Sequence, residues 1–125
     1  MLLGAALALA GCAGEGGVAC PAIGWSNGLT VELAEDWPAV DGGSVRIECS
    51  SPCGAAYPAG TPLTGTTAAV QVDMTTPDSV VVTVLAADET EVAEVDAALD
   101  WVRVGGSERC GGPSEATVTV PAPPA

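Results

Sequence analysis

A chain of 125 residues with no Phe and only one Tyr has room for one domain, whose core must use smaller apolar side chains and three Trp. Its 16 Asp and Glu against three Arg, with no Lys and no His, give a formal net charge of −13. Such a chain is repelled by nucleic acid and anionic lipid headgroups, so we expect no nucleic-acid partner. Without His or Lys it has no Ser-His-Asp triad or Schiff-base lysine, so we expect no enzyme, with paired carboxylates as the catalytic alternative.

The chain opens with an apolar run, residues 2–10, that has the length of a signal-peptide h-region and is too short to span a bilayer. The quartet Leu9-Ala10-Gly11-Cys12 resembles the lipobox of bacterial lipoproteins, in which small residues precede a cysteine that receives the lipid. The resemblance implies a signal peptide over residues 1–11 and a diacylglycerol thioether, with palmitate among its acyl chains, on Cys12. An ordinary secretory peptide with a spare cysteine is the alternative.

The segment after the lipobox, residues 12–19, is rich in Gly and predicts a flexible tether that reaches about 15 Å on the random-coil estimate. Two acyl chains anchor a protein for long times, whereas one binds marginally. We therefore expect an extracytoplasmic domain held by lipid at the outer face of the cell membrane. The composition, rich in Ala, Gly, Val and Pro, resembles uncharacterised lipoproteins of high-GC Gram-positive bacteria.

Alternation of apolar and polar residues recurs along the chain and predicts strands at 28–34, 43–49, 68–74 and 116–120. Another segment, 79–87, is apolar on both faces, as a central strand would be. Turns that contain Gly, Pro and Asp separate these segments.

Residues 89–104 fit two patterns. The apolar residues at 92, 95, 99 and 102 have helical spacing, but the odd positions from Ala93 to Trp101 are all apolar and form a longer alternation. This alternation favours one strand over a helix, and the upstream Asp88-Glu89 pair suits a hairpin turn.

Six or seven short strands in about 100 residues predict an all-β fold, an antiparallel β-sandwich of about seven strands with an immunoglobulin-like architecture. We expect this domain to occupy residues 20–121 and residues 122–125 to form a disordered Pro-Ala tail.

The four remaining cysteines are an even set in an exported chain, which predicts two disulfides in an oxidising compartment. Four cysteines allow three pairings. Cys49 and Cys53 flank a tight turn and can pair with each other, which leaves Cys20 to pair with Cys110. A zinc site on the C-x₃-C spacing is the alternative, made weaker by the absence of His. No catalytic residue and no cofactor are predicted.

Two acidic loops are weak candidates for a divalent cation, since Ca²⁺ prefers several oxygens supplied by loops. Neither loop matches the EF-hand pattern, and the alternative is a pair of solvated acidic turns. The candidate ligands are Glu35, Asp36 and Asp41 in the first loop, and Asp88, Glu89 and Glu91 in the second.

The three tryptophans are candidates for stacking on a sugar or an apolar partner. Trp37 precedes Pro38 in a loop and is the one expected to be an exposed contact. Trp101 lies on the apolar side of its segment and is expected in the core, and Trp25 is expected to plug one end of the sandwich.

The leading functional hypothesis is a non-catalytic, lipid-anchored interaction or envelope-structural module with an unknown protein or envelope partner. The alternative is a lipoprotein that binds a divalent cation or a sugar through the acidic loops or Trp37.

Overall fold

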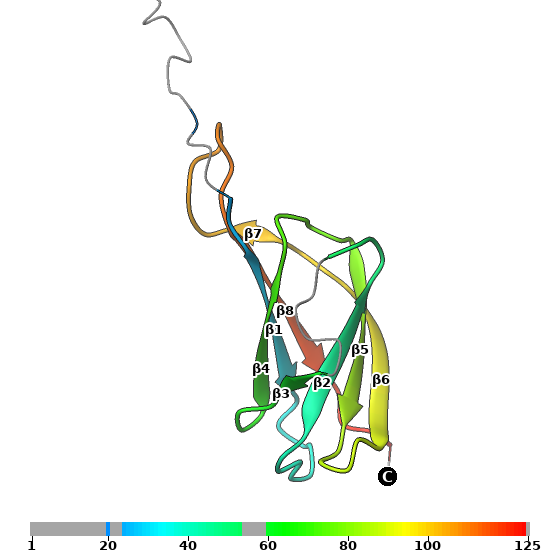
Figure 1. Cartoon of the computed structure of the whole chain (residues 1–125). Helices are drawn as coiled ribbons and strands as arrows, with labels where there is room; N and C mark the ends of the chain where they lie inside the picture. Colours follow the sequence, from blue (N-terminus) through cyan, green and yellow to red (C-terminus); the bar gives the residue numbers. More distant parts are fainter. Residues whose placement is uncertain (1–19, 21–23, 54–59, 125) are drawn as a thin grey trace, which may run out of the picture.

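The computed structural model describes Cys20, residues 24–53 and residues 60–124 (Figure 1). These residues form strands and turns and no helix, which confirms the prediction of an all-β domain. The described part of the chain accordingly has no helix that could cross a bilayer. The strands are β1 (Asn27–Leu33), β2 (Ser44–Cys49), β3 (Thr61–Pro62), β4 (Thr67–Val72), β5 (Ser79–Leu85), β6 (Glu91–Ala98), β7 (Val102–Arg103) and β8 (Ser114–Val120).

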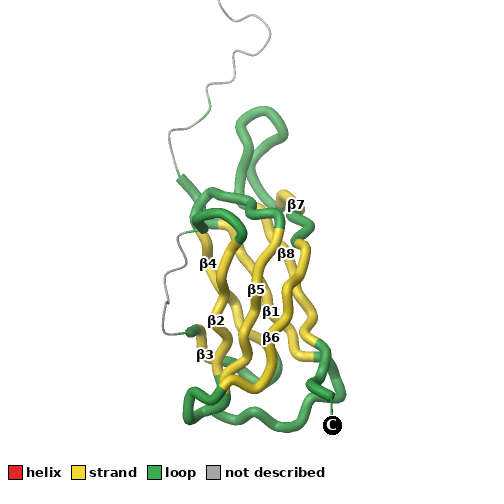
Figure 2. The backbone as a smooth tube through the Cα atoms, turned by 90° about the vertical axis from the view of Figure 1, so that its right-hand side faces the viewer, coloured by secondary structure: helices red, strands yellow, loops and turns green. Residues whose placement is uncertain are grey.

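The strands of the described ranges form two four-stranded sheets that face each other (Figures 1 and 2). The first sheet has the order β4-β1-β8-β7, and the second has the order β3-β2-β5-β6. Neighbouring strands are antiparallel except β1 and β8, which run parallel. The prediction of a purely antiparallel sandwich is wrong at this pair, because alternation determines the face that a residue occupies and not the direction of its neighbour.

The core between the sheets consists of small apolar side chains at alternate strand positions. In β1, Leu29, Val31 and Leu33 point inward, and β4 and β8 bury every second residue in the same way. β5 lies between β2 and β6 and buries residues on both faces, as its apolar sequence predicts. Because valine is the most frequent residue in this interior, the core is thin. Larger side chains are needed to close the two ends of the sandwich.

The segment predicted as one strand, 89–104, forms two strands in different sheets. β6 belongs to the second sheet and ends at Ala98, and residues 99–101 cross over to β7 in the first sheet. The prediction of one long strand is therefore wrong beyond Ala98. The apolar alternation continues past Ala98 because Leu99 and Trp101, in the crossover segment, also pack against the core. The pattern therefore does not show where the chain leaves one sheet for the other.

The C-terminal residues follow β8 along the edge of the sandwich. Ala122 packs against the core and Pro123 is half-buried. The expectation of a disordered tail over residues 122–125 stays a prediction, beside these contacts of Ala122 and Pro123 with the sandwich.

The strands run between two ends of the sandwich that differ in composition (Figure 1). We call the end that carries both disulfides the disulfide end, and the opposite end the acidic-loop end. The disulfide end comprises Cys20 and the loops 50–53, 73–78, 99–101 and 104–113. The acidic-loop end comprises the loops 34–43, 63–66 and 86–90 and the C-terminal residues 121–124.

Candidate functional site

The two predicted disulfides are both present. Cys20 joins Cys110 with the Cα atoms 5.3 Å apart, and Cys49 joins Cys53 with the Cα atoms 6.1 Å apart. Since these bonds use all four thiols, none is left as a thiolate to bind zinc as the alternative required. The cysteines are cross-links at one end of the domain.

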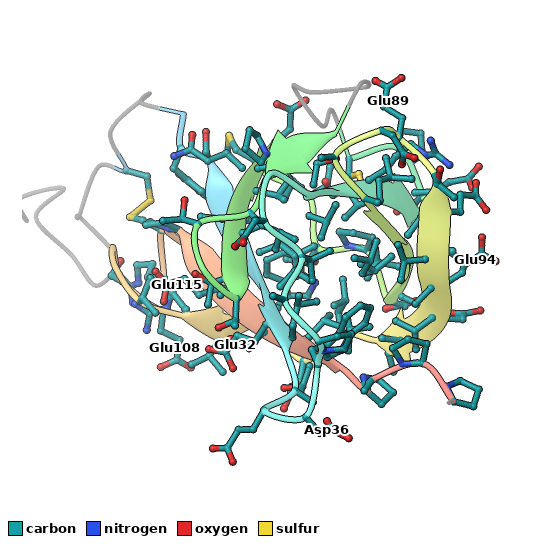
Figure 3. All side chains as sticks on the ribbon, turned by 90° about the horizontal axis from the view of Figure 1, so that it is seen from below. Glu32, Asp36, Glu89, Glu94, Glu108 and Glu115 are labelled. Carbon is teal, nitrogen blue, oxygen red and sulfur yellow. A yellow bond between two sulfur atoms is a disulfide. The ribbon has the colours of Figure 1, made fainter. Side chains whose placement is uncertain are left out.

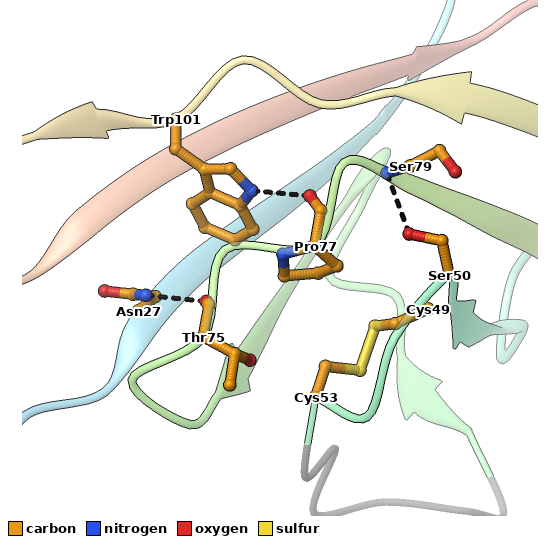
Figure 4. The surroundings of a disulfide bond; sticks show 8 residues. All are labelled: Asn27, Cys49, Ser50, Cys53, Thr75, Pro77, Ser79 and Trp101. Atoms are coloured by element: carbon orange, nitrogen blue, oxygen red, sulfur yellow. Dashed lines mark hydrogen bonds between the residues drawn. A yellow bond between two sulfur atoms is a disulfide. The ribbon is translucent and has the colours of Figure 1, made fainter.

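The second of these cross-links organises the loops around it (Figure 4). The Ser79 N–H donates to the Ser50 hydroxyl at 3.2 Å, next to the Cys49–Cys53 bond. Cys53 is buried, so this disulfide fills space at the end of the sandwich as well as closing its turn.

The proposed lipid site lies outside the described residues. The signal peptide 1–11, the tether 12–19 and the lipid acceptor Cys12 all precede the described Cys20. What the structure describes is the point of entry: the Cys20–Cys110 bond fixes the chain at the disulfide end, eight positions after Cys12 in the sequence.

Trp37 is part of the core, and the expectation of an exposed contact is wrong. Its side chain is 9% exposed, and its indole Nε1–H donates to the Val120 carbonyl at 2.7 Å. The β1–β2 loop folds back over the acidic-loop end because an indole ring gains free energy from burial once its N–H has a partner. The position of Trp37 before a proline in a loop does not predict how deeply its side chain is buried.

Trp101 closes the opposite end in the same manner. It packs against the core, as expected, and its Nε1–H donates to the Pro77 carbonyl at 2.9 Å (Figure 4). Trp25 is half-buried and lies against the hairpin that follows β7, where a Cβ atom added to Gly111 would be 3.2 Å from its ring. No tryptophan of the three presents a freely exposed ring, so a stacking platform has no support here.

The second acidic loop is a tight hairpin turn that uses its own polar groups. The Glu89 N–H donates to the Ala86 carbonyl at 2.9 Å, and Glu89 adopts a φ of 69°. The Asp88 carboxylate accepts the Thr90 N–H at 3.0 Å. Hydrogen bonds from the Thr90 side chain and backbone lower the pKa of Asp88 below its usual value. This geometry is that of a well-formed turn.

The two acidic loops touch without forming a metal site. A Cβ atom added to Gly42, which follows Asp41, would lie 3.3 Å from the Ala87 Cβ, so the loops are neighbours. Glu91, in contrast, points to Arg46 and forms an ion pair with it at 2.9 Å. Among the described residues no three carboxylates or cysteines gather as metal ligands. The six candidate ligands are therefore not brought together.

Carboxylates cover much of the remaining surface. Seen from the acidic-loop end, the labelled acidic side chains radiate outward from both sheets (Figure 3). They come from the loops and from the outer strand faces, and the labelled ones are Glu32, Asp36, Glu89, Glu94, Glu108 and Glu115. Outward carboxylates of this kind are solvated charges rather than a paired acid and base.

Asn27 is a buried polar residue that the sequence analysis missed. Its amide donates to the Thr75 carbonyl and its oxygen accepts the Ser114 N–H, each at 2.8 Å. It therefore ties the start of β1 to the loop 73–78 and to the start of β8. The Ser-Asn-Gly sequence around it is typical of a turn, which concealed this role.

Clefts that the sequence did not indicate open on the described surface, and one of about 250 Å³ lies between Glu48, Ser79 and Asp96. A cleft of about 160 Å³ lies over the outer face of the first sheet, between Gln71, Val104 and Glu115. A groove of about 220 Å³ lies between residues 92–95 of β6 and residues 120–124. The groove is lined mainly by apolar side chains and runs beside an open strand edge, so it is the strongest of these three candidates for a contact site.

Comparison with known proteins finds no protein family, no curated protein and no solved structure that matches this chain. A functional assignment therefore depends on the geometry described above and on the lipobox resemblance of residues 9–12.

Proposed function

We propose that this chain is a lipid-anchored extracytoplasmic module that acts by binding a protein or envelope partner and not by catalysis. The lipobox resemblance at Cys12 supports the anchor. The two disulfides support an oxidising compartment outside the cytoplasm. An immunoglobulin-like type of sandwich is part of the proposal, supported by the two facing sheets of short strands.

The observation that carries the proposal is the position of the Cys20–Cys110 bond at one end of the sandwich. If Cys12 carries lipid, a tether of eight positions holds the disulfide end within about 15 Å of the membrane surface. The acidic-loop end then points away from the membrane.

The non-catalytic part of the proposal follows from the side chains available. The sequence has no His and no Lys, and the thiols of its four domain cysteines are taken up in disulfides. The carboxylates that Figure 3 labels point outward. A sandwich with such a surface suits recognition through its edges and faces.

Substitution of Cys12 tests the anchor directly. Cys12→Ala is expected to prevent incorporation of labelled palmitate and to release the protein from the membrane fraction. The matched control is the double variant Cys49→Ala/Cys53→Ala, which also removes cysteine but leaves Cys12 in place and is expected to stay acylated. Membrane retention of the Cys12→Ala protein, or a wild-type protein without label, would overturn the anchor.

Site-specific photo-crosslinking tests the orientation and the interaction role in the native envelope. A crosslinking residue at Glu108, in the hairpin of the disulfide end, is expected to label lipid. The same residue at Asp36, in the first acidic loop, is expected to label protein or not react, but never lipid. Labelling of lipid from Asp36 and not from Glu108 would reverse the proposed orientation.

A further inference from the structure

The two sheets end next to each other on one side of the sandwich, and both edges are open there. β6 is the last strand of the second sheet, paired only with β5 within the described ranges. β8 is covered on its outer side only by the two residues of β7, which pair with Ser114 and Glu115. Figure 2 shows β6 and β8 next to each other along this side.

The pairing register identifies which backbone groups of β6 are free. The Leu99 N–H donates to the Asp78 carbonyl, so at this end of the pair the odd-numbered residues face β5. In an antiparallel ladder the intervening residues turn their N–H and C=O groups the other way. Those of Glu94 and Asp96 therefore point to the open edge, where a further strand would bind.

The inner face of β6 is also incompletely covered. Ala93, Val95 and Ala97 point inward and are half-buried, whereas their partners on β5 are fully buried. The groove between residues 92–95 and 120–124 opens at the same place. An added strand would bury these apolar side chains and fill the groove with its own.

The chain's own C-terminal segment lines this groove, and the described residues 121–124 form no backbone hydrogen bond with β6. It contributes Pro121, Pro123 and Pro124, and proline has no N–H to donate to a strand ladder. The polar groups of the edge thus stay available beside an apolar wall.

The charges on β6 decide what kind of strand fits. Glu94 and Asp96 are exposed on the outer face, next to the free edge. A second copy that paired through β6 would place these carboxylates against their equivalents, and like charges opposite each other destabilise a strand pair. A segment with Arg or Lys at alternate positions would instead place opposite charges there.

We propose that β6 binds an extended segment of a partner protein as an additional strand, with basic residues facing Glu94 and Asp96 and apolar residues entering the groove. This inference rests on the proposed interaction function and is independent of the lipid anchor. It specifies the partner chemistry as an unfolded or loosely held basic, alternating segment.

The test uses the full chain and a blocked eight-residue peptide that alternates valine and arginine. Binding is measured by calorimetry, and the site is located by the exchange of backbone amide hydrogens. We expect slower exchange at Glu94 and Asp96 when the peptide is bound. A peptide of the same sequence, N-methylated at alternate residues on its hydrogen-bonding edge, is expected to bind at least about tenfold more weakly, since it cannot complete the ladder.

Charge reversal on the protein supplies the matched comparison. Glu94→Lys/Asp96→Lys is expected to weaken binding of the valine-arginine peptide at least about tenfold. The same variant is expected to bind more tightly a peptide that alternates valine and glutamate. Glu32→Lys/Glu115→Lys changes the net charge equally on the other sheet and is expected to have a much smaller effect. The circular dichroism of each variant shows that the fold is kept.

The inference would be overturned by no binding, by equal binding of the N-methylated peptide, or by equal loss of binding in the two charge-reversed variants. The last two would mean that the peptide adheres to the acidic surface without strand pairing. Self-association of the chain through β6 would also overturn it. A native partner that crosslinks elsewhere on the domain would refute strand addition at β6 and leave the proposed interaction function standing.

Discussion

The two ends of the sandwich are closed by the same type of side chain but secured by different means. At the disulfide end Trp101 donates its indole N–H to Pro77, and both disulfides lie around it. At the acidic-loop end Trp37 donates its indole N–H to Val120 and is more deeply buried, with no disulfide among the described residues there. A narrow core of valines leaves each end open, and an indole with a satisfied N–H closes it.

In the proposed arrangement the lipid anchor is attached through the chain that enters at the disulfide end. A domain held by its N-terminal segment is pulled at the disulfide end, and a covalent bond resists such a pull better than packing does. The acidic-loop end bears no such load in the proposed arrangement, so packing and backbone hydrogen bonds are enough. Variants at each end, compared by their free energies of unfolding, test this difference.

The largest effect is expected from loss of the long-range disulfide. Cys20 and Cys110 are 90 positions apart, so Cys20→Ala/Cys110→Ala should lower the free energy of unfolding by about 4 to 5 kcal/mol on the chain-entropy model. Cys49→Ala/Cys53→Ala, which opens a loop of four positions, should cost only about 2 kcal/mol. Equal losses in urea unfolding would show that loop closure is not what these bonds contribute.

A slightly smaller loss is expected at the opposite end. Trp37→Ala removes a buried indole and should lower the free energy of unfolding by about 3 to 5 kcal/mol. Trp37→Phe keeps a ring but loses the hydrogen bond to Val120, and should cost about 1 to 2 kcal/mol. A Trp37→Ala protein with an unchanged melting temperature would place the ring outside the core.

A gain is expected in the turn of the second acidic loop. Glu89 holds a φ of 69°, a conformation that glycine adopts without steric cost. Glu89→Gly should therefore raise the free energy of unfolding by up to about 1 kcal/mol. Asp88→Gly, one position earlier, should instead destabilise, because it removes the acceptor of the Thr90 N–H. Thermal unfolding that ranks these two variants in reverse would contradict the turn geometry.

The smallest effect is expected from the ionisation of Asp88. Its pKa is lowered in the folded state by hydrogen bonds from Thr90, so its contribution to stability is complete above the unfolded pKa of about 3.9 and declines as the pH falls through the folded value. Asp88→Asn should remove this part of the acid-induced loss. Carboxyl ¹³C shifts that give Asp88 an ordinary or raised pKa would contradict the hydrogen bonds.

Several features could be predicted from particular residues. The alternation in β1 predicts a strand with one buried face, because successive side chains of a strand point to opposite sides of the sheet; the buried residues are Leu29, Val31 and Leu33. The spacing of Cys49 and Cys53 around a turn is local, and once that pair is assigned the other pair follows. These features depend on neighbours within a few positions, and such neighbours are visible in the sequence.

Other features depend on partners that the sequence does not name. The parallel pairing of β1 with β8 joins residues more than eighty positions apart, from Gly28 with Glu115 onward. The depth of Trp37 depends on the Val120 carbonyl, and the crossover at residues 99–101 depends on β8. The groove beside β6 arises only when the C-terminal prolines come to lie against it.

An acidic domain of short strands, most with an apolar and a polar side, could be predicted from the residues alone, and so could its two disulfides. Alternation, turn residues and cysteine spacing are local properties, so they survive without knowledge of the fold. The neighbours of each strand, the tryptophans that close the two ends and the strand edge that stays open are visible only in the folded domain. Those choices are made by the free energy of packing distant segments together, which no local pattern encodes.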